Sequence, residues 1–119
     1  MPTNQVKKYD LEERTAKFGE DVIKFCQQLP RSNITDPLVN QLVKAATSVG
    51  ANYCEADDAE SKKDFKHKLG ICKKESRESK HFLRMLAVAL PESKNNLRLL
   101  WQEAKELNLI FNAIYRKVS

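Results

Sequence analysis

The feature that most constrains the fold is a repeat of apolar residues, at alternating steps of four and three, along four segments of the chain. Such steps place side chains on one face of an α-helix, so each segment predicts an amphipathic helix with one buried stripe. The longest stripe begins at Phe65 and ends at Leu90. No segment keeps the period-two alternation that is typical of a β-strand.

Residues that start or stop helices separate the four segments. We expect the first helix to begin at Asp10, where Glu13 completes a capping box, and to end at Pro30. We expect the second helix to begin at Asp36 and Pro37. An acid at the cap followed by proline is typical of a helix N-terminus.

Similar signals bound the other two helices. Four acids fall within residues 55–60 and repel one another, which predicts the second turn there. Ser61 is expected to cap a third helix of about 28 residues, or about 42 Å at 1.5 Å per residue, which Pro91 ends. Ser93 is expected to cap a fourth helix that extends to Val118.

Four such helices with short connections predict an all-α fold, an antiparallel up-down-up-down four-helix bundle. We place this single domain at residues 10–119 and expect residues 1–9 to form a loose tail. A chain of 119 residues with 41% hydrophobic residues is long enough for one core. Three glycines and four prolines are too few for the turns of an all-β protein.

The sequence indicates a cytoplasmic protein without a membrane segment. Residues 1–5 lack the apolar core of a signal peptide, and the longest apolar run, residues 85–90, is too short to span a bilayer. The three cysteines are odd in number and form no CxxC pair, which predicts reduced thiols. We expect Cys72 to pack in the core and Cys26 beside it, and the acidic turn should raise the pKa of Cys54.

Four short segments together resemble a known family: Asp10–Thr15, Gln41–Ala56, Ala59–Phe65 and Gly70–Glu75. In this order they are similar to the bacterial four-helix-bundle proteins first met as products of intervening sequences in large-subunit ribosomal RNA genes. The resemblance extends over residues 9–117. It implies a four-helix bundle without enzymatic activity, in a family whose functions are mostly unknown and of which some members form ring-shaped homopentamers. The accessory protein of diversity-generating retroelements is similar in fold and ring assembly, and it binds nucleic acid.

The net charge of +5 is concentrated on the third predicted helix. Between Lys62 and Arg84 nine basic residues stand against three acids, so the rest of the chain sums to −1. Six of these cations form a row beside the apolar stripe, which we call the basic line: Lys62, Lys66, Lys73, Arg77, Lys80 and Arg84. A row of cations on a rigid helix can follow a phosphate backbone and release its counterions.

Two interpretations of the basic line stay open. In the first, it binds structured RNA or DNA through the backbone. Base stacking is not indicated, because His67, His81 and Phe82 are the only rings near it in the sequence. In the second, the protein is a structural or adaptor homo-oligomer that binds a protein partner. The basic line then pairs, within or between chains, with acids of the first helix, namely Glu12, Glu13, Glu20 and Asp21. The apolar residues of the fourth helix bind the partner.

The second helix contains a helix-packing motif of small and polar residues, which consists of Thr47, Ser48, Gly50, Ala51 and Asn52. Glycine inside a helix costs about 1 kcal/mol relative to alanine, so Gly50 indicates close approach of another helix. We expect the polar members, with Ser76 and Ser79, to make interhelical hydrogen bonds that fix the register. A polar ligand pocket is the alternative.

The fourth helix has apolar residues outside its stripe, and we interpret them as an oligomer interface: Leu99, Leu109 and Ile110. With the resemblance, they lead us to expect a homo-oligomer, most simply a pentamer.

No catalytic or metal site is predicted. Glu78 with His81 and Asp64 with His67 each resemble half of a di-iron motif, but the two pairs lie about 21 Å apart on one helix. No set of nucleophile, base and orienting residue is visible, and no glycine-rich phosphate loop exists. We therefore expect no cofactor, no small-molecule substrate and no enzymatic activity.

Overall fold

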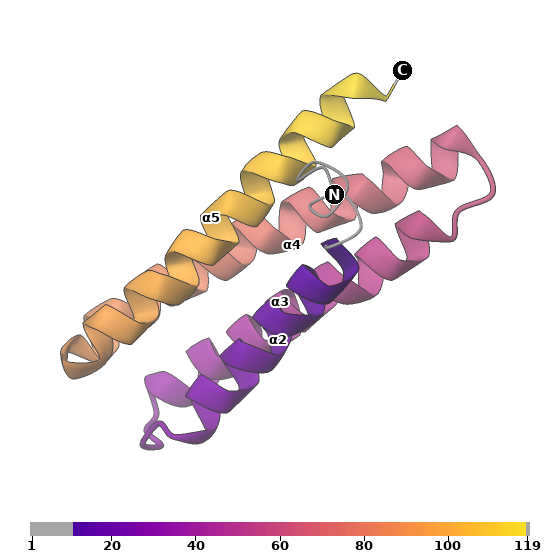
Figure 1. Cartoon of the computed structure of the whole chain (residues 1–119). Helices are drawn as coiled ribbons and strands as arrows, with labels where there is room; N and C mark the ends of the chain where they lie inside the picture. The colour runs from indigo at the N-terminus through magenta and orange to yellow at the C-terminus, as the bar shows by residue number, and fades with distance from the viewer. Residues whose placement is uncertain (1–10, 119) are drawn as a thin grey trace.

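The computed structural model describes residues 11–118 and contains, within them, four α-helices, one 3₁₀ turn and no strand. The helices are α2 (Leu11–Gln27), α3 (Thr35–Asp57), α4 (Lys62–Ala89) and α5 (Lys94–Lys117), with η1 (Pro91–Ser93) before the last. The predicted all-α class with four helices is confirmed. Figure 1 shows the chain turning back at each connection. The predicted cap at Asp10 and the tail at residues 1–9 lie outside the described residues.

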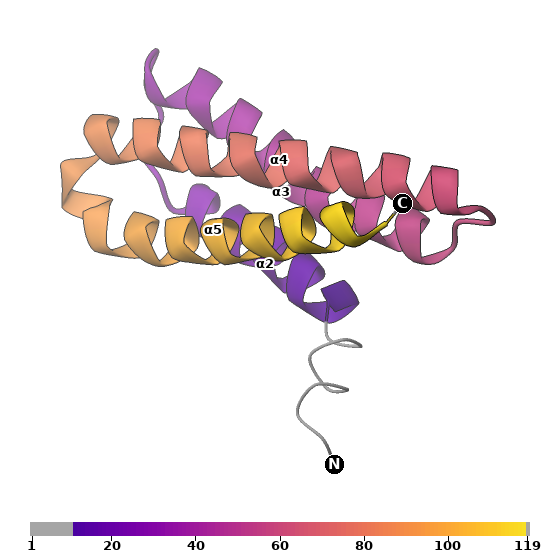
Figure 2. The ribbon, with the colours of Figure 1, turned by 90° about the horizontal axis from the view of Figure 1, so that it is seen from above.

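Helices that follow each other in the chain pack side by side. α3 packs against both α2 and α4, and α4 packs against α5, whereas α2 touches α5 only sparsely. Within residues 11–118, the backbones of α2 and α4 do not come close, and neither do those of α3 and α5. Side chains still meet between α3 and α5, where the ring centroids of Tyr53 and Phe111 lie 6.1 Å apart. Figure 2 shows α4 and α5 running alongside each other. The backbone measures 44 × 31 × 20 Å along its principal axes.

The core consists of the apolar stripes of all four helices. Each fully buried large side chain stabilises the fold by about 1.5–3 kcal/mol. The largest are Phe18 and Val22 on α2, Leu42 and Val49 on α3, Leu69, Leu83 and Leu86 on α4, and Leu97, Leu107 and Phe111 on α5. No helix in the described part of the chain has an apolar stretch sufficient to cross a membrane.

Two helix starts differ from the sequence prediction. α3 begins one residue early, at Thr35, whose backbone N–H donates to the Ser32 hydroxyl at 2.9 Å. Asp36 lies in the first turn, where its carboxylate pairs with Arg31 at 3.1 Å rather than capping the helix. Ser93 belongs to η1 and makes no side-chain capping bond to α5. A short 3₁₀ turn therefore replaces the predicted cap.

The start of α4 is as predicted. The Ser61 hydroxyl accepts a hydrogen bond from the backbone N–H of Asp64 at 3.0 Å, which satisfies one of the free donors of the first turn. Asp64 itself places negative charge near the helix N-terminus. The helix has the predicted 28 residues and ends before Pro91.

Gly50 lies where α3 approaches α2. A Cβ atom at Gly50 would stand 3.4 Å from the backbone carbonyl and the hydroxyl of Thr15. From the other side, a Cβ atom at Gly19 of α2 would stand 3.6 Å from the carbonyl oxygen of Ala46. The two glycines together bring the backbones of α2 and α3 close.

The polar members of the helix-packing motif bond within their own helix, so the expected interhelical bonds from them are wrong. Thr47 donates to the carbonyl of Val43, Ser48 to that of Lys44 and Asn52 to that of Ser48, at 2.7–2.8 Å. Hydroxyl and amide side chains can satisfy themselves on a carbonyl one turn earlier. On α4, Ser79 does the same with Glu75.

Candidate functional site

The basic line lies on the side of α4 that faces α5. The ammonium groups of Lys66 and Lys73 lie 4.7 and 4.0 Å from the ring centroid of Tyr115, which belongs to α5. The ammonium group of Lys80 lies 5.6 Å from the ring of Trp101. Contacts of this kind are worth about 0.5–1 kcal/mol at exposed sites, enough to bias the lysines toward α5.

These two rings correct one expectation from the sequence. The only rings near the basic line were expected to be His67, His81 and Phe82. Trp101 and Tyr115 are distant in sequence, but packing of α5 on α4 brings them to the row. The remaining members of the basic line, Lys62, Arg77 and Arg84, are exposed.

A groove of about 490 Å³ runs between α4 and α5, and we call it the α4–α5 groove. Four cations and two amides line it, and no carboxylate is among the lining residues. They are Gly70, Lys73, Lys74, Arg77, Lys80, Asn108 and Asn112. Such a lining can neutralise a phosphate backbone and also donate hydrogen bonds to it.

Asn108 fixes how the two helices meet at the groove. Its side-chain nitrogen donates to the carbonyl of Lys73 at 2.9 Å and to the Ser76 hydroxyl at 3.1 Å. Its side-chain oxygen accepts from Asn112 at 3.2 Å. Ser76 is therefore the one polar residue of the predicted set that makes an interhelical bond within residues 11–118.

α5 contributes a second row of cations, which was not predicted from the sequence. The ammonium group of Lys105 lies 5.5 Å from the ring of Trp101, so this row adjoins the basic line. The row is recognisable from its steps of four, seven and eleven residues, which share one helix face. It consists of Lys94, Arg98, Lys105 and Arg116, all exposed.

Positive charge is therefore shared by two neighbouring helices rather than confined to one. α4 has nine basic residues against three acids and α5 has five against two, which gives +9. α2 and α3 together have four basic residues against seven acids, which gives −3. The molecule has one basic and one acidic pair of helices.

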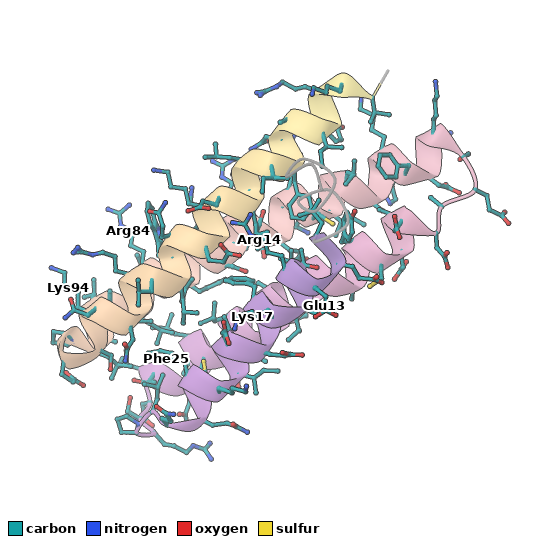
Figure 3. All side chains as sticks on the ribbon, in the orientation of Figure 1. Glu13, Arg14, Lys17, Phe25, Arg84 and Lys94 are labelled. Atoms are coloured by element: carbon teal, nitrogen blue, oxygen red, sulfur yellow. The ribbon has the colours of Figure 1, made fainter. Side chains whose placement is uncertain are left out.

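The acids of α5 face α2 rather than the groove. Arg14 of α2 binds Glu103 at 2.8 Å and Glu106 at 2.9 Å, and this arrangement raises the pKa of Arg14 further. Figure 3 shows Arg14 between the two helices, whereas Arg84 and Lys94 lie toward the turn that joins α4 to α5. We call this cluster the Arg14 clamp.

The ion pairs found in residues 11–118 leave the basic line out. Lys17 pairs with Asp21 within α2 at 3.4 Å. Lys68, on another side of α4, pairs with Glu55 of α3 at 2.6 Å. The alternative, pairing of the basic line with Glu12, Glu13, Glu20 and Asp21, is not seen within residues 11–118, where no ion pair joins α2 to α4.

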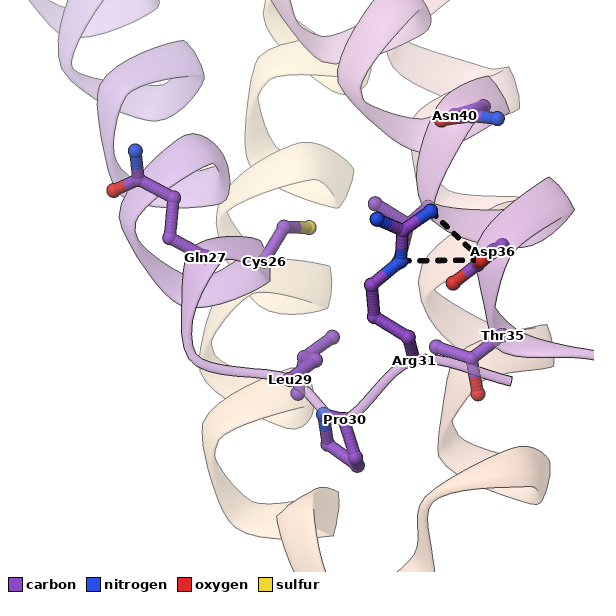
Figure 4. A pocket seen from close by; sticks show the side chains of 9 residues that line it. Cys26, Gln27, Leu29, Pro30, Arg31, Thr35, Asp36 and Asn40 are labelled. Carbon is purple, nitrogen blue, oxygen red and sulfur yellow. Dashed lines mark hydrogen bonds and ion pairs between the residues drawn. The ribbon is translucent and has the colours of Figure 1, made fainter.

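Figure 4 shows a pocket of about 360 Å³ at the connection between α2 and α3. The hydrogen-bonded pair of Arg31 and Asp36 borders it and lowers the pKa of the Asp36 carboxyl. Burial raises the pKa of the Cys26 thiol to about 11, so the thiol is protonated at neutral pH. The pocket therefore offers no activated nucleophile.

Cys72 lies in the core as predicted, and the pKa of Cys54 is raised as predicted, but the acidic turn is a minor cause of that rise. Cys72 is fully buried, and burial raises its pKa to about 12. The pKa of Cys54 is raised by desolvation and by its hydrogen bond to Glu12. Neither is a thiolate at neutral pH.

The two histidines lie apart. His67 borders a surface pocket with acidic residues, and His81 packs edge-on against Phe82 at 5.3 Å between ring centroids. Across residues 11–118, no three histidine, cysteine, aspartate or glutamate side chains gather into a cluster that could hold a metal ion.

The three residues of the predicted oligomer interface do not form one patch. Leu99 is 72% exposed and Leu109 is 56% exposed, whereas Ile110 is half-buried against the core. Leu99 and Ile110 share a helix face with Glu103, on the side toward α2. Leu109 lies on the face of the cation row.

The chain is similar to known proteins in sequence and in fold. The model of the family described as 23S rRNA-intervening sequence proteins matches residues 7–113. A crystal structure of a protein of unknown function from the S23 ribosomal protein family of Bacteroides thetaiotaomicron shares the fold, with a TM-score of 0.83 at 23% identity. The match covers 93% of this chain and 99% of that chain. No curated protein matches this chain.

Proposed function

The chain belongs to the 23S rRNA-intervening sequence protein family, and from this premise we propose that it is a non-enzymatic bundle that binds the backbone of structured RNA or DNA. The observation that supports the proposal is the α4–α5 groove, in which four cations and two amides meet without a carboxylate. The cation row of α5 lies on one of the two helices that form this groove. A nucleic-acid backbone is the polyanion that such a surface fits.

The chemistry of the groove favours backbone contact over base readout. Lysine and arginine neutralise phosphates without regard to sequence, and backbone contacts dominate non-specific affinity. Asn112 can add a hydrogen bond at a fixed position, because one N–H of its amide donates to Asn108 and the other is left to donate to a phosphate. Binding is therefore strongly dependent on salt and only weakly dependent on sequence.

A protein-binding adaptor is the second candidate function. The exposure of Leu99 and Leu109 favours it, because large exposed apolar side chains can meet a partner. The adaptor also needs the basic line to pair with acids of α2, within one chain or between chains, and no ion pair of residues 11–118 joins α2 to α4. This difference favours nucleic acid as the partner.

The proposal includes self-assembly in the cytoplasm. We propose that the up-down-up-down bundle forms a homo-oligomer, a pentameric ring by the family resemblance, with Leu99 in the contact between subunits. Several grooves on one particle would then bind one polyanion with avidity, provided that the sites engage together.

A salt series tests nucleic-acid binding. With five contacted phosphates per site, the logarithm of affinity for duplex DNA should fall against the logarithm of salt with a slope of about −4.5. The combined variant Lys73→Gln, Arg77→Gln and Lys80→Gln should lessen this slope by about 0.9 per lost contact. Fluorescence anisotropy of a labelled duplex gives both values.

A charge-matched control separates the groove from net charge. Lys17→Gln, Lys24→Gln and Lys44→Gln remove the same charge from α2 and α3, and the slope should then stay close to that of the wild type. Equal losses in both triple variants, or an unchanged affinity in the first, would contradict the proposed groove.

Sedimentation velocity tests the proposed assembly. We expect the wild-type protein to sediment as an oligomer and Leu99→Gln to shift it toward the monomer, because an exposed apolar contact is lost. Ile23→Gln on α2, where the wild-type side chain is 37% exposed, is the matched control. A monomeric wild-type protein would refute the ring.

A further inference from the structure

A second pocket lies between α4 and α5, close to the turn that joins them, and we call it the Trp101 pocket. It has a volume of about 360 Å³. Its floor is apolar, because Leu83 and Leu97 are buried there, and its rim is basic. The lining residues are Leu83, Arg84, Ala87, Lys94, Leu97, Arg98 and Trp101.

The Trp101 pocket continues the α4–α5 groove. Lys80 lines the groove and also lies over the ring of Trp101, which lines the pocket. Arg84 follows Lys80 by one helical turn on α4 and lines the pocket in turn. A strand that follows the basic line toward the turn therefore reaches the pocket next.

The lining selects a ligand with flat apolar faces and an attached anion. Three exposed cations and no carboxylate surround the apolar floor, so the rim attracts an anionic group, whereas an uncharged apolar side chain would use the floor alone. An unpaired nucleotide supplies both parts, because its base presents an apolar face for stacking and its phosphates pair with the rim.

We propose that the Trp101 pocket binds one unpaired base of a strand whose backbone lies in the α4–α5 groove. This inference rests on the proposed function and narrows its substrate class to structured nucleic acid with an overhang or another unpaired nucleotide. The base stacks on Trp101, and Arg84, Lys94 and Arg98 bind the phosphates beside it.

Trp101 is the only tryptophan of the chain, so its emission reports on the pocket directly. Three duplexes of equal length serve as probes: one blunt, one with a short single-stranded overhang, and one whose overhang is abasic but has the same phosphates. The intact overhang should bind about fivefold tighter or more than the abasic one, as expected for base–aromatic stacking. The intact overhang should change the emission of Trp101 more than the abasic overhang, which shows the effect of the phosphates alone.

A pocket-filling variant supplies the second arm of the test. Ala87→Leu places a larger side chain in the pocket and should abolish the preference for the intact overhang without reducing affinity for the blunt duplex. Ala16→Leu, at an exposed position of α2, is the matched control and should keep the preference for the intact overhang. The comparison of the three probes on the wild-type protein stands even where a variant fails to fold.

The outcomes separate this inference from the proposed function. Salt-dependent binding that is equal for all three duplexes, with the same change in emission, overturns the inference alone. A preference for the intact overhang that survives in Ala87→Leu also overturns the inference. So does an emission change that depends on protein concentration and not on the overhang, because it indicates that a second copy of the chain occupies the pocket. Absence of binding to every duplex overturns both.

Discussion

At Gly50 a single missing side chain decides how closely two helices pack. Thr15 of α2 lies 3.4 Å from the place that a Cβ atom would take, which is ordinary van der Waals contact. A methyl group therefore fits there, whereas a longer side chain must displace the backbone of α2.

Gly50→Leu should lower the free energy of unfolding by about 1–3 kcal/mol, the usual effect of overpacking. Gly50→Ala is the control and should leave stability unchanged or raise it by up to about 1 kcal/mol, since alanine favours the helix. Denaturant unfolding measures both. A leucine variant as stable as the wild type would contradict close packing at this position.

Glu75 is a local weakness of α4. Desolvation, and then the neighbouring Glu78, raise the pKa of the Glu75 carboxyl. A carboxyl whose pKa is higher in the folded state than in the unfolded state favours folding at acid pH, and this stability is lost as pH rises through the folded-state pKa.

Glu75→Gln should therefore raise the melting temperature by a small amount at neutral pH and have little effect near pH 4, below the ordinary pKa of about 4.3. Thermal unfolding at the two pH values checks this, with exposed Glu20→Gln as the control. A melting temperature that falls at neutral pH would show that the carboxylate stabilises the helix instead.

Single residues were predictable where the local sequence leaves one solution. Ser61 caps α4 because it directly precedes the first helical residue and its hydroxyl can accept from the N–H of Asp64. Cys72 lies in the core because it continues the stripe. The bonds of Thr47 and Ser48 were not predictable, because a helical hydroxyl can bond across helices or to its own helix, and spacing does not distinguish the two.

Among the helices, α2 depends most on one ionic contact. It packs along α3 but touches α5 sparsely, and the Arg14 clamp spans that side. Hydrogen bonds from Gln102 and then Arg14 lower the pKa of Glu106. Stabilisation from this carboxylate is present above the unfolded-state pKa and is lost as pH falls through the folded-state value.

Arg14→Gln should reduce the free energy of unfolding by about 1 kcal/mol at neutral pH, the scale of a partly exposed ion-pair network. It should also flatten the loss of stability that the wild type shows between about pH 5 and pH 3. Lys17→Gln, which breaks an exposed pair inside α2, is the control. Parallel pH profiles for Arg14→Gln and wild type would contradict the role of the clamp.

The existence of the four helices and the length of α4 followed from periodicity. The starts of α3 and α5, the end of α2 at Gln27 instead of Pro30, and the contact between helix faces did not. The start of α3 depends on Ser32, which lies before the expected cap, and η1 replaces a cap at Ser93. The α4–α5 groove depends on the register of two helices, which Asn108 fixes through bonds across 32 and 35 residues of sequence. Local patterns carry no signal for such a register.

At the scale of the whole molecule, charge divides between two pairs of helices. The basic pair, α4 and α5, was only half predicted, because a count along the chain found the +6 of one helix and overlooked the aligned cations of the next. Their alignment becomes apparent once α5 is placed beside α4.

This division of charge predicts that cations of α5 bind nucleic acid together with those of α4. Lys105→Gln with Arg116→Gln, both on α5, should reduce the magnitude of the salt slope by up to about 0.9 per lost phosphate contact. Lys24→Gln with Lys44→Gln, on the acidic pair, should not. A slope that responds only to variants of α4 would confine the interface to the basic line.

The sparse contact between α2 and α5 also sets the order in which the backbone opens to solvent. α2 is the shortest of the four α-helices described and is held chiefly by one neighbour, so its detachment leaves the three remaining helices packed on one another. Amide protons of α2 should accordingly exchange with deuterium before those in the middle of α3, α4 and α5. Proteolytic cleavage should likewise begin in α2.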